Sequence, residues 1–163
     1  MNIMLLGNTG SGKSTLAGLL ASRHNFKHVN TGSLTRMMAS FGCNNLPILV
    51  QDMIKTMSHN DNHIFDHFYM HTWQQLTDLF GEPVVVIIED RRSGARDTNA
   101  RKSKRFAKQL PTIYRFMCEH HIIPIKVYNT DYGFDVSELI RADILPFDEF
   151  PMLELEPGEQ NEK

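Results

Sequence analysis

Cysteine is scarce in this sequence, since Cys43 and Cys118 are the two among 163 residues. Two cysteines so far apart in sequence do not indicate a disulfide framework or a zinc site, and they favour a reducing compartment. Long apolar runs are missing too, and none approaches the ~20 residues that a membrane-spanning helix needs. A strand is predicted from residue 2, which leaves no room for a signal peptide. We therefore expect a cytoplasmic protein without membrane contact.

An excess of positive charge is also lacking, because the formal net charge is -2 and the pI is about 6.4. This balance argues against nucleic-acid binding through a broadly basic surface. The charges are unevenly placed: eight of the 17 basic residues lie within 91–108, and six of the 19 acids lie within 148–162. With 41% hydrophobic residues, the chain is predicted to form one domain over about 1–145, followed by an acidic, proline-containing tail over 146–163.

The residues that follow the first predicted strand match a phosphate-binding loop. The pattern is Gly, four residues and Gly-Lys-Ser, directly after the apolar run 3–6. Glycines let backbone N–H groups turn toward phosphate oxygens, and the N-terminus of the next helix adds partial positive charge. Lys13 is expected to reach the β- and γ-phosphates of a nucleotide, and the Ser14 hydroxyl to ligate Mg²⁺. The predicted nucleotide-binding residues are Gly7, Asn8, Thr9, Gly10, Ser11, Gly12, Lys13, Ser14 and Thr15.

Hydrophobic periodicity predicts an α/β fold in which strands alternate with helices. Continuous apolar runs indicate parallel strands that are covered on both faces. The predicted strands are 2–6, 26–29, 84–88 and 122–128, and the predicted helices are 13–23, one through 36–38, 46–57, 63–80, one that begins at about 111, and 135–141. The pattern predicts a three-layer phosphate-loop NTPase fold, with a mostly parallel sheet of about four to five strands flanked by helices.

The strand predicted over 84–88 ends in an acidic pair, Glu89 and Asp90. In phosphate-loop proteins such a strand carries the carboxylate that holds Mg²⁺ directly or through water. Consecutive side chains of a strand point to opposite faces, so only one of the two can face the phosphates. We predict that this residue is Asp90, acting through water. The alternative is a solvent-exposed strand end without a metal role.

The helix predicted over 63–80 carries two features with open interpretations. The candidates to stack on a nucleobase are Phe65, Phe68, Tyr69 and Trp73, with Phe65 and Tyr69 preferred, although core packing is the commoner fate of aromatic side chains at helical spacing. Histidines also recur there at four-residue spacing, which suits either a metal site or a polar margin beside the apolar stripe. These histidines are His59, His63, His67 and His71. No acid or thiol is placed with them, which favours the polar margin.

The segment 29–36, Val-Asn-Thr-Gly-Ser-Leu-Thr-Arg, resembles the one that adenylate kinases and related nucleoside monophosphate kinases carry after the second strand. The spacing from Thr31 to Arg36 matches that family. The resemblance implies that Thr31 and Gly32 lie against the acceptor base and that Arg36 holds its phosphate, for which a guanidinium offers a planar fork. The alternative is an ordinary helix N-cap followed by a surface arginine.

Asp90-Arg91-Arg92 is a second match. Adenylate kinases carry an Asp and a nearby Arg after the third strand, and thymidylate and deoxynucleoside kinases carry an acid–Arg pair there. The resemblance implies that Arg91 or Arg92 binds the acceptor, without choosing between them. The basic segment can also supply positive charge around a transferred phosphoryl group, with Arg96 and Arg101 as a mobile clamp. For the later basic residues of this segment, a solvated helix face is the alternative.

These matches predict a nucleoside or deoxynucleoside monophosphate kinase that transfers the γ-phosphoryl group of ATP, with Mg²⁺, to a (d)NMP. Lys13, Arg91, Arg92, Arg96 and Arg101 are its predicted catalytic residues, and 30–82 holds the acceptor. Small nucleotides are the predicted partners, and a homodimer is compatible with the sequence. Adenylate kinases place a lid after the fourth strand, whereas neither a full lid nor a fifth strand is evident here, so the resemblance covers about 1–92.

Two other functions are compatible with the same residues. The first is a kinase that acts on a hydroxyl of a nucleoside or small metabolite, for which Glu89 or Asp90 would serve as the base. The second is a nucleotide-binding regulator with little turnover.

Overall fold

The structure is a computed structural model that describes residues 1–8, 10–30, 40, 46–68, 70–94, 100–147 and 151–154, without the side chains of 46, 47, 49, 71 and 100–103. The strands are β1 (Asn2–Leu6), β2 (Phe26–Val29), β3 (Asn62–Phe65), β4 (Val84–Asp90), β5 (Ile125–Thr130), β6 (Gly133–Asp135) and β7 (Met152–Leu153). The helices are α1 (Lys13–His24), α3 (Leu46–Lys55), the 3-10 helix η1 (Met70–Thr72), α4 (Trp73–Phe80), α5 (Ala100–Glu119) and α6 (Ser137–Arg141).

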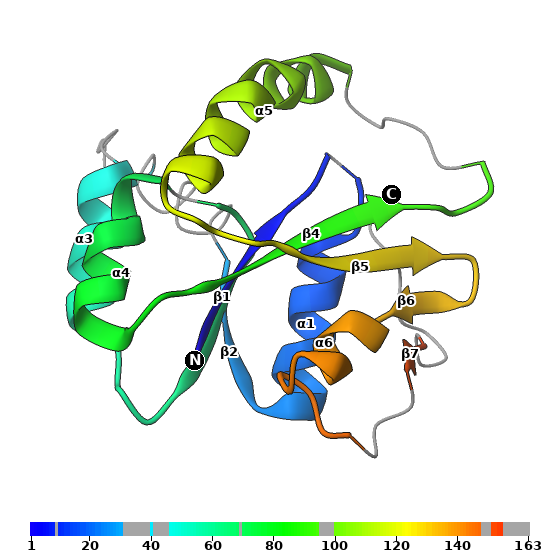
Figure 1. Ribbon diagram of the computed structural model, residues 1–163, viewed down its shortest axis with the longest axis horizontal. Helices are drawn as coiled ribbons and strands as arrows, with labels where there is room; N and C mark the ends of the chain where they lie inside the picture. Colours follow the sequence, from blue (N-terminus) through cyan, green and yellow to red (C-terminus); the bar gives the residue numbers. More distant parts are fainter. Residues whose placement is uncertain are drawn as a thin grey trace.

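A sheet with the strand order β2-β3-β1-β4-β5-β6-β7 runs through the molecule. The strands from β2 to β5 in this order are parallel, whereas β6 and β7 are each antiparallel to the strand before them. Helices α1 and α6 cover one face, and α3, α4 and α5 cover the other (Figure 1). The predicted α/β fold with a mostly parallel sheet flanked by helices is confirmed, and the sheet has more strands than the four to five expected.

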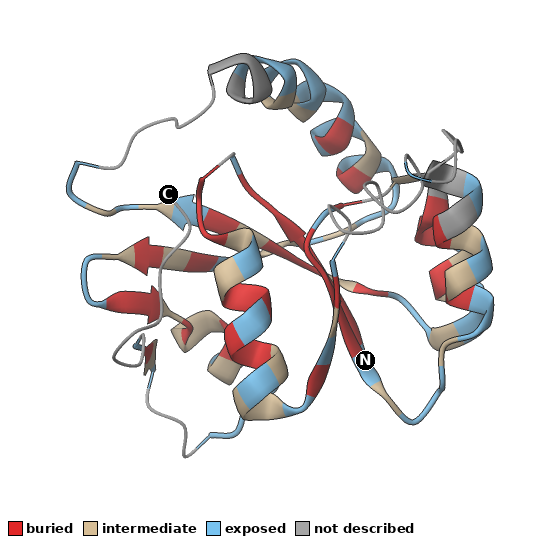
Figure 2. Ribbon diagram, turned by 180° about the vertical axis from the view of Figure 1, so that it is seen from behind, coloured by how far each residue is buried: buried red, intermediate tan, exposed pale blue. Residues whose placement is uncertain are grey.

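Both faces of the central strands are buried, which explains why their sequences are nearly continuous apolar runs. In β1, Ile3 and Leu5 pack in the cluster that contains α1, whereas Met4 and Leu6 pack in the cluster that contains α3 and α4. Figure 2 shows the buried positions gathered in the strands and on the inner side of α1. This two-sided packing holds the carboxyl ends of β3, β1 and β4 side by side.

The helix predicted over 63–80 is wrong in its first half. The residues Asn62–Phe65 form β3, which lies between β2 and β1 and pairs in parallel with both. The helix itself is confined to α4, preceded by η1. His63, Ile64 and Phe65 are buried because β2 and β1 flank the strand and a hydrophobic cluster packs on each of its two faces. Their apolar spacing suits a helix equally well, so only the tertiary pairing decides for a strand.

Helix α5 begins earlier than predicted. Pro111 was expected in its first turn, but it lies inside a helix that starts at Ala100. Pro111 is exposed, so the side of the helix that lacks a backbone hydrogen bond faces solvent. Most described side chains before Ile113 are exposed as well, and Figure 2 shows this half of α5 in pale blue and tan.

The C-terminal third also differs from expectation. Strand β5 starts at Ile125 and not at 122, because Pro124 lacks the N–H that a paired strand needs. The helix predicted over 135–141 is α6, and Asp135 belongs to β6. Within the predicted tail, Met152–Leu153 forms β7 on the sheet edge, and Leu153 is buried. No helix in the described ranges has the length and hydropathy to cross a membrane.

Candidate active site

The phosphate loop, residues 7–15, joins the end of β1 to the start of α1 at the carboxyl edge of the sheet. The Ser11 N–H donates to the Asn8 carbonyl at 3.0 Å, and the Leu16 N–H donates to the Gly12 carbonyl at 2.9 Å. Gly10 and Gly12 have positive φ angles of 78° and 104°, and Gly12 is the N-cap of α1. This backbone turns the first amides of α1 toward the loop, which is the geometry that binds phosphate oxygens.

The loop leaves no room for larger residues at two of its glycines. A Cβ on Gly7 would lie 2.6 Å from Ser11 Oγ, and a Cβ on Gly12 would lie 2.7 Å from Asn129 Nδ2. The Ser11 hydroxyl is buried and makes no hydrogen bond with the described atoms. A glycine-lined cradle with a helix N-terminus at its base therefore fits the phosphates of a nucleotide.

Lys13 lies at the rim of this cradle. Its Nζ donates to the Gly7 carbonyl at 2.8 Å and to the Asn8 carbonyl at 3.1 Å. These bonds fold the side chain back over the loop, so its charge is at the place where phosphates are expected. The adjacent Ser14 is exposed in the first turn of α1 and offers a hard oxygen ligand that suits Mg²⁺.

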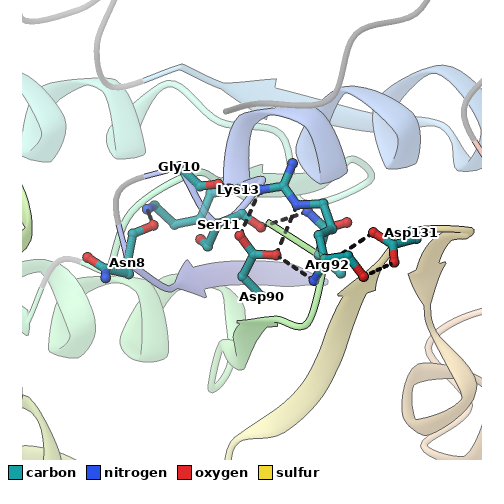
Figure 3. Close-up of polar contacts among 9 residues, drawn as sticks. Asn8, Gly10, Ser11, Lys13, Asp90, Arg92 and Asp131 are labelled. Atoms are coloured by element: carbon teal, nitrogen blue, oxygen red, sulfur yellow. Dashed lines mark hydrogen bonds and ion pairs between the residues drawn. The ribbon is translucent and has the colours of Figure 1, made fainter. Parts of the chain in front are cut away.

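Asp90 and Arg92 close the loop from the β4 side (Figure 3). Asp90 Oδ1 accepts from Arg92 Nε at 2.9 Å and from the Arg92 N–H at 3.1 Å, and Asp90 Oδ2 accepts from Arg92 Nη2 at 2.7 Å. The same Nη2 donates to the Gly10 carbonyl at 2.6 Å. Burial alone would raise the pKa of Asp90, but the hydrogen bonds and charge of Arg92 outweigh it and lower the pKa. Asp90 is therefore ionised at neutral pH and already paired.

The end of β5 and the turn after it supply a second set of contacts that the sequence did not reveal. Asn129 is fully buried, and its Nδ2 donates to the Ser11 carbonyl at 3.0 Å. Asp131 accepts from the Ser93 N–H at 2.8 Å and from the Ser93 hydroxyl at 2.7 Å. Asn129 thus joins β5 to the phosphate loop across 118 positions of sequence, and Asp131 joins the turn after β5 to the residues after β4.

The two arginines after Asp90 have different surroundings. Arg92 has 17% of its side chain exposed and is committed to Asp90 and to the phosphate loop. Arg91 has 54% exposed and points to the opposite face of the sheet, where its guanidinium lies 3.8 Å from the ring centroid of Tyr128. Of the two, Arg91 is the one that a ligand can reach without breaking a contact to the loop.

The presence of β3 changes which strand of this chain corresponds to which strand of the adenylate kinases. Val84–Asp90 is now the fourth strand, and the basic segment after it occupies the place where those enzymes carry a lid. The third strand is followed by Asp66, which is 7% exposed and lies 3.2 Å from His28 through Oδ2 and Nε2. No arginine follows Asp66 before α4. The pattern of an apolar run ending in an acid is present in His-Ile-Phe-Asp, but the helical spacing around it masks the signal.

A pocket of about 600 Å³ lies between the loop after β3 and helix α5. Its apolar wall is made by Phe68, Met70 and Ile113, and its polar wall carries two cations, Arg105 and Lys108. The remaining lining residues are His67, Gln109 and Thr112. The size suits a small ligand, and the mixed walls suit one with a planar apolar part and an anionic group.

The structure separates several candidates that the sequence grouped together. Phe65 is fully buried in the core, so the prediction that it stacks on a base is wrong, and Phe68 is the aromatic residue at the pocket. His59 Nε2 donates to the Leu79 carbonyl at 2.8 Å, His63 lies in β3, and His67 lines the pocket. They do not share a helix face, and the described residues contain no cluster of three metal-ligating side chains.

Several predicted site residues lie outside the described residues. For the nucleotide site this applies to Thr9, and for the acceptor site to Thr31, Gly32, Arg36 and Tyr69. In the basic segment it applies to Arg96 and to the side chain of Arg101, although the backbone of 101 belongs to α5. Their roles stay predictions.

No protein-family model matches the chain. An adenylate kinase from Borrelia turicatae (strain 91E135) is 32% identical over 89 residues, covering 42% of this chain and 41% of that protein. An adenylate kinase from Methanothrix thermoacetophila is 53% identical over 36 residues, covering 22% of this chain and 17% of that protein. The resemblance to adenylate kinases is therefore confirmed for part of the chain. The alignments span less than half of the length of these relatives.

A solved gluconokinase from Sinorhizobium meliloti 1021 superposes on the described fold with a TM-score of 0.48 and 14% identity. The superposition covers 77% of this chain and 81% of the gluconokinase.

Proposed function

We propose that this protein is an ATP-dependent kinase that transfers the γ-phosphoryl group to a nucleoside or deoxynucleoside monophosphate. The observation that carries the proposal is the arrangement at the carboxyl edge of the sheet. A braced phosphate loop with Lys13 on its rim lies after β1, and a pocket lined by Arg105 and Lys108 borders the loop after the neighbouring β3. The partial similarity to proteins named adenylate kinase supports the same function.

The donor site in this proposal is the phosphate loop. Its backbone amides and Lys13 hold the phosphates of ATP, and Ser14 ligates Mg²⁺. Asp90 was predicted to reach the metal through water, and Asp66 is a second carboxylate in an equivalent place at the end of β3. Mg²⁺, when bound, neutralises charge on the phosphate oxygens.

The acceptor site in this proposal is the pocket under α5. The apolar wall at Phe68 and Met70 accommodates a base, and the cations of α5, Arg105 and Lys108, add positive charge beside it. Because a monophosphate acceptor is already an oxyanion at neutral pH, its reaction needs positioning and electrostatic stabilisation but no general base. Basic residues in the pocket meet that need, whereas none of the described residues that line it is a carboxylate.

The proposal is tested by ATP consumption in the presence of a panel of acceptors. The panel contains the common nucleoside and deoxynucleoside monophosphates, the matching nucleosides and gluconate, with ADP and phosphorylated product as the readouts. Stimulation by one or more monophosphates is expected. Stimulation by a nucleoside or gluconate alone would show a hydroxyl kinase, and nucleotide binding with no stimulation by any acceptor would favour the regulator.

A matched pair of substitutions separates the two carboxylates. If Asp66 holds the metal, Asp66→Asn should raise the Mg²⁺ concentration needed for half-maximal activity, and Asp90→Asn should leave it unchanged. The reverse result would assign the metal to Asp90.

A further inference from the structure

Arg91 is held in place more firmly than its exposure suggests. Its backbone N–H donates to the Asn129 carbonyl at 2.7 Å, its Nε donates to Glu89 Oε1 at 3.3 Å, and its guanidinium lies over the ring of Tyr128. The two Nη atoms make no hydrogen bond to the residues that the structure describes. The first contact fixes the main chain, and the other two orient the side chain while its two Nη atoms stay available, so Arg91 has already lost much of the side-chain entropy that binding an anion would cost.

The register of the sheet explains why these three side chains meet. Glu89 of β4 is paired with Tyr128 of β5, so the two side chains stand next to each other on one face. Arg91 follows Glu89 by two positions and returns to that face. It is the face covered by α3, α4 and α5, opposite to the face that α1 covers. Ligands of open α/β sheets bind beyond the carboxyl ends of the strands, where this arginine lies.

We infer that Tyr128 is a positioning residue that holds Arg91 ready to bind the phosphate of the acceptor. The inference deepens the proposed function and rests on it for the identity of the anion. Tyr128 acts by stacking, which keeps the guanidinium plane fixed and leaves its Nη fork for phosphate oxygens. Arg92, in contrast, stays on the donor side because Asp90 and the Gly10 carbonyl occupy its fork.

The test is a double-mutant cycle read out by binding, so that it does not depend on turnover. Nucleoside monophosphates and the matching nucleosides are titrated by calorimetry into the parent, Tyr128→Val, Arg91→Ala and the double variant, with saturating Mg²⁺ and ADP. Valine is chosen because a β-branched residue suits a strand. We expect Tyr128→Val to weaken monophosphate binding about three- to fivefold, as an exposed cation–π contact predicts. Nucleoside binding should change less than about twofold, because a nucleoside has no phosphate for Arg91 to contact.

The double variant decides whether Tyr128 acts through Arg91. If it does, the double variant binds monophosphates as Arg91→Ala does, because the ring has no cation left to hold. Additive losses, or equal losses for monophosphates and nucleosides, would overturn the inference. A parent that binds none of the monophosphates would overturn it as well. If the binding losses are non-additive as expected but the protein phosphorylates no acceptor, the proposed kinase function is wrong and the anion site at Arg91 is still supported.

Three further variants guard against a merely structural effect. Tyr128→Phe keeps the ring and should bind within about twofold of the parent, whereas Arg91→Lys keeps the charge but loses the planar fork and should lose affinity as Tyr128→Val does. Tyr114→Leu removes a tyrosine that is 48% exposed on α5 and makes no ring contact in the described part of the chain. It should bind as the parent does. Loss of binding in Tyr128→Phe, or parental affinity in Arg91→Lys, would contradict the role of stacking.

Discussion

The phosphate loop and the pocket under α5 lie at the same edge of the sheet but are built in opposite ways. Two side chains with little exposure hold the loop: buried Asn129 donates to its Ser11 carbonyl, and half-buried Arg92 donates to its Gly10 carbonyl. The pocket has one wall on the half of α5 that precedes Pro111, where most described side chains are exposed. The donor side is therefore preformed, and the acceptor side carries its cations on a sparsely packed helix.

Replacing Lys13 should have the largest effect. It tests whether the phosphate loop holds the phosphates of the donor during phosphoryl transfer. Lys13→Ala removes the cation at the loop rim, and we expect kcat to fall by about two to three orders of magnitude. The side chain is only partly buried, so the unfolding midpoint should stay close to that of the parent. Retained activity would show that the donor phosphates lie elsewhere.

Two glycines of the same region test how tightly the loop is built. Gly12→Ala forces a side chain into a left-handed backbone beside Asn129, and we expect a loss of about 1–3 kcal/mol in unfolding free energy with at least tenfold weaker ATP binding. Gly18→Ala is the matched control, because a Cβ there meets nothing within 4 Å. It should stabilise α1 by about 0.5–1 kcal/mol and leave ATP binding unchanged. Denaturant unfolding and calorimetry measure both effects.

Removing a charge from α5 tests the acceptor side, the pocket under α5. Lys108→Ala should raise the acceptor KM at least about tenfold and leave the ATP KM within about twofold, because a charge-assisted contact is worth about 1.5–3 kcal/mol. Lys104→Ala is the control: it lies on the same helix and is exposed, but it does not line the pocket. An equal effect of the two variants would mean that α5 attracts substrate by general charge and that the pocket is not the acceptor site.

The smallest expected effect concerns the pH dependence of the Asp90–Arg92 pair beside the phosphate loop. The pKa of Asp90 is lowered from about 3.8, so its pairing with Arg92 stabilises the folded protein above that pH. The contribution is lost as the pH falls below 3.8 and through the lower pKa of the folded state. Asp90→Asn should therefore flatten the fall in unfolding free energy over that acidic range. An unchanged dependence of the unfolding free energy on pH, measured by denaturant titration, would show that the pairing of Asp90 with Arg92 contributes nothing to stability there.

The sequence by itself determined the donor half. The pattern from Gly7 to Thr15 sets the turn, the lysine and the start of α1 through local chemistry, because glycine conformations and helix N-termini act within a few residues. It also determined that a strand ends at Asp90, since a continuous apolar run is a strong signal. The α/β class followed from the same alternation of runs.

Only the tertiary structure decided the rest. By their spacing, the residues from His63 to Phe65 suit a helix or a strand. They form a strand because they pair in parallel with β2 on one side and with β1 on the other. That placement buried Phe65, moved Asp66 to the end of the third strand and shifted every later strand by one. Tyr128 meets Arg91, and Asn129 meets Ser11, through strand register across long separations. Such contacts depend on which strands become neighbours, and no local pattern encodes that choice.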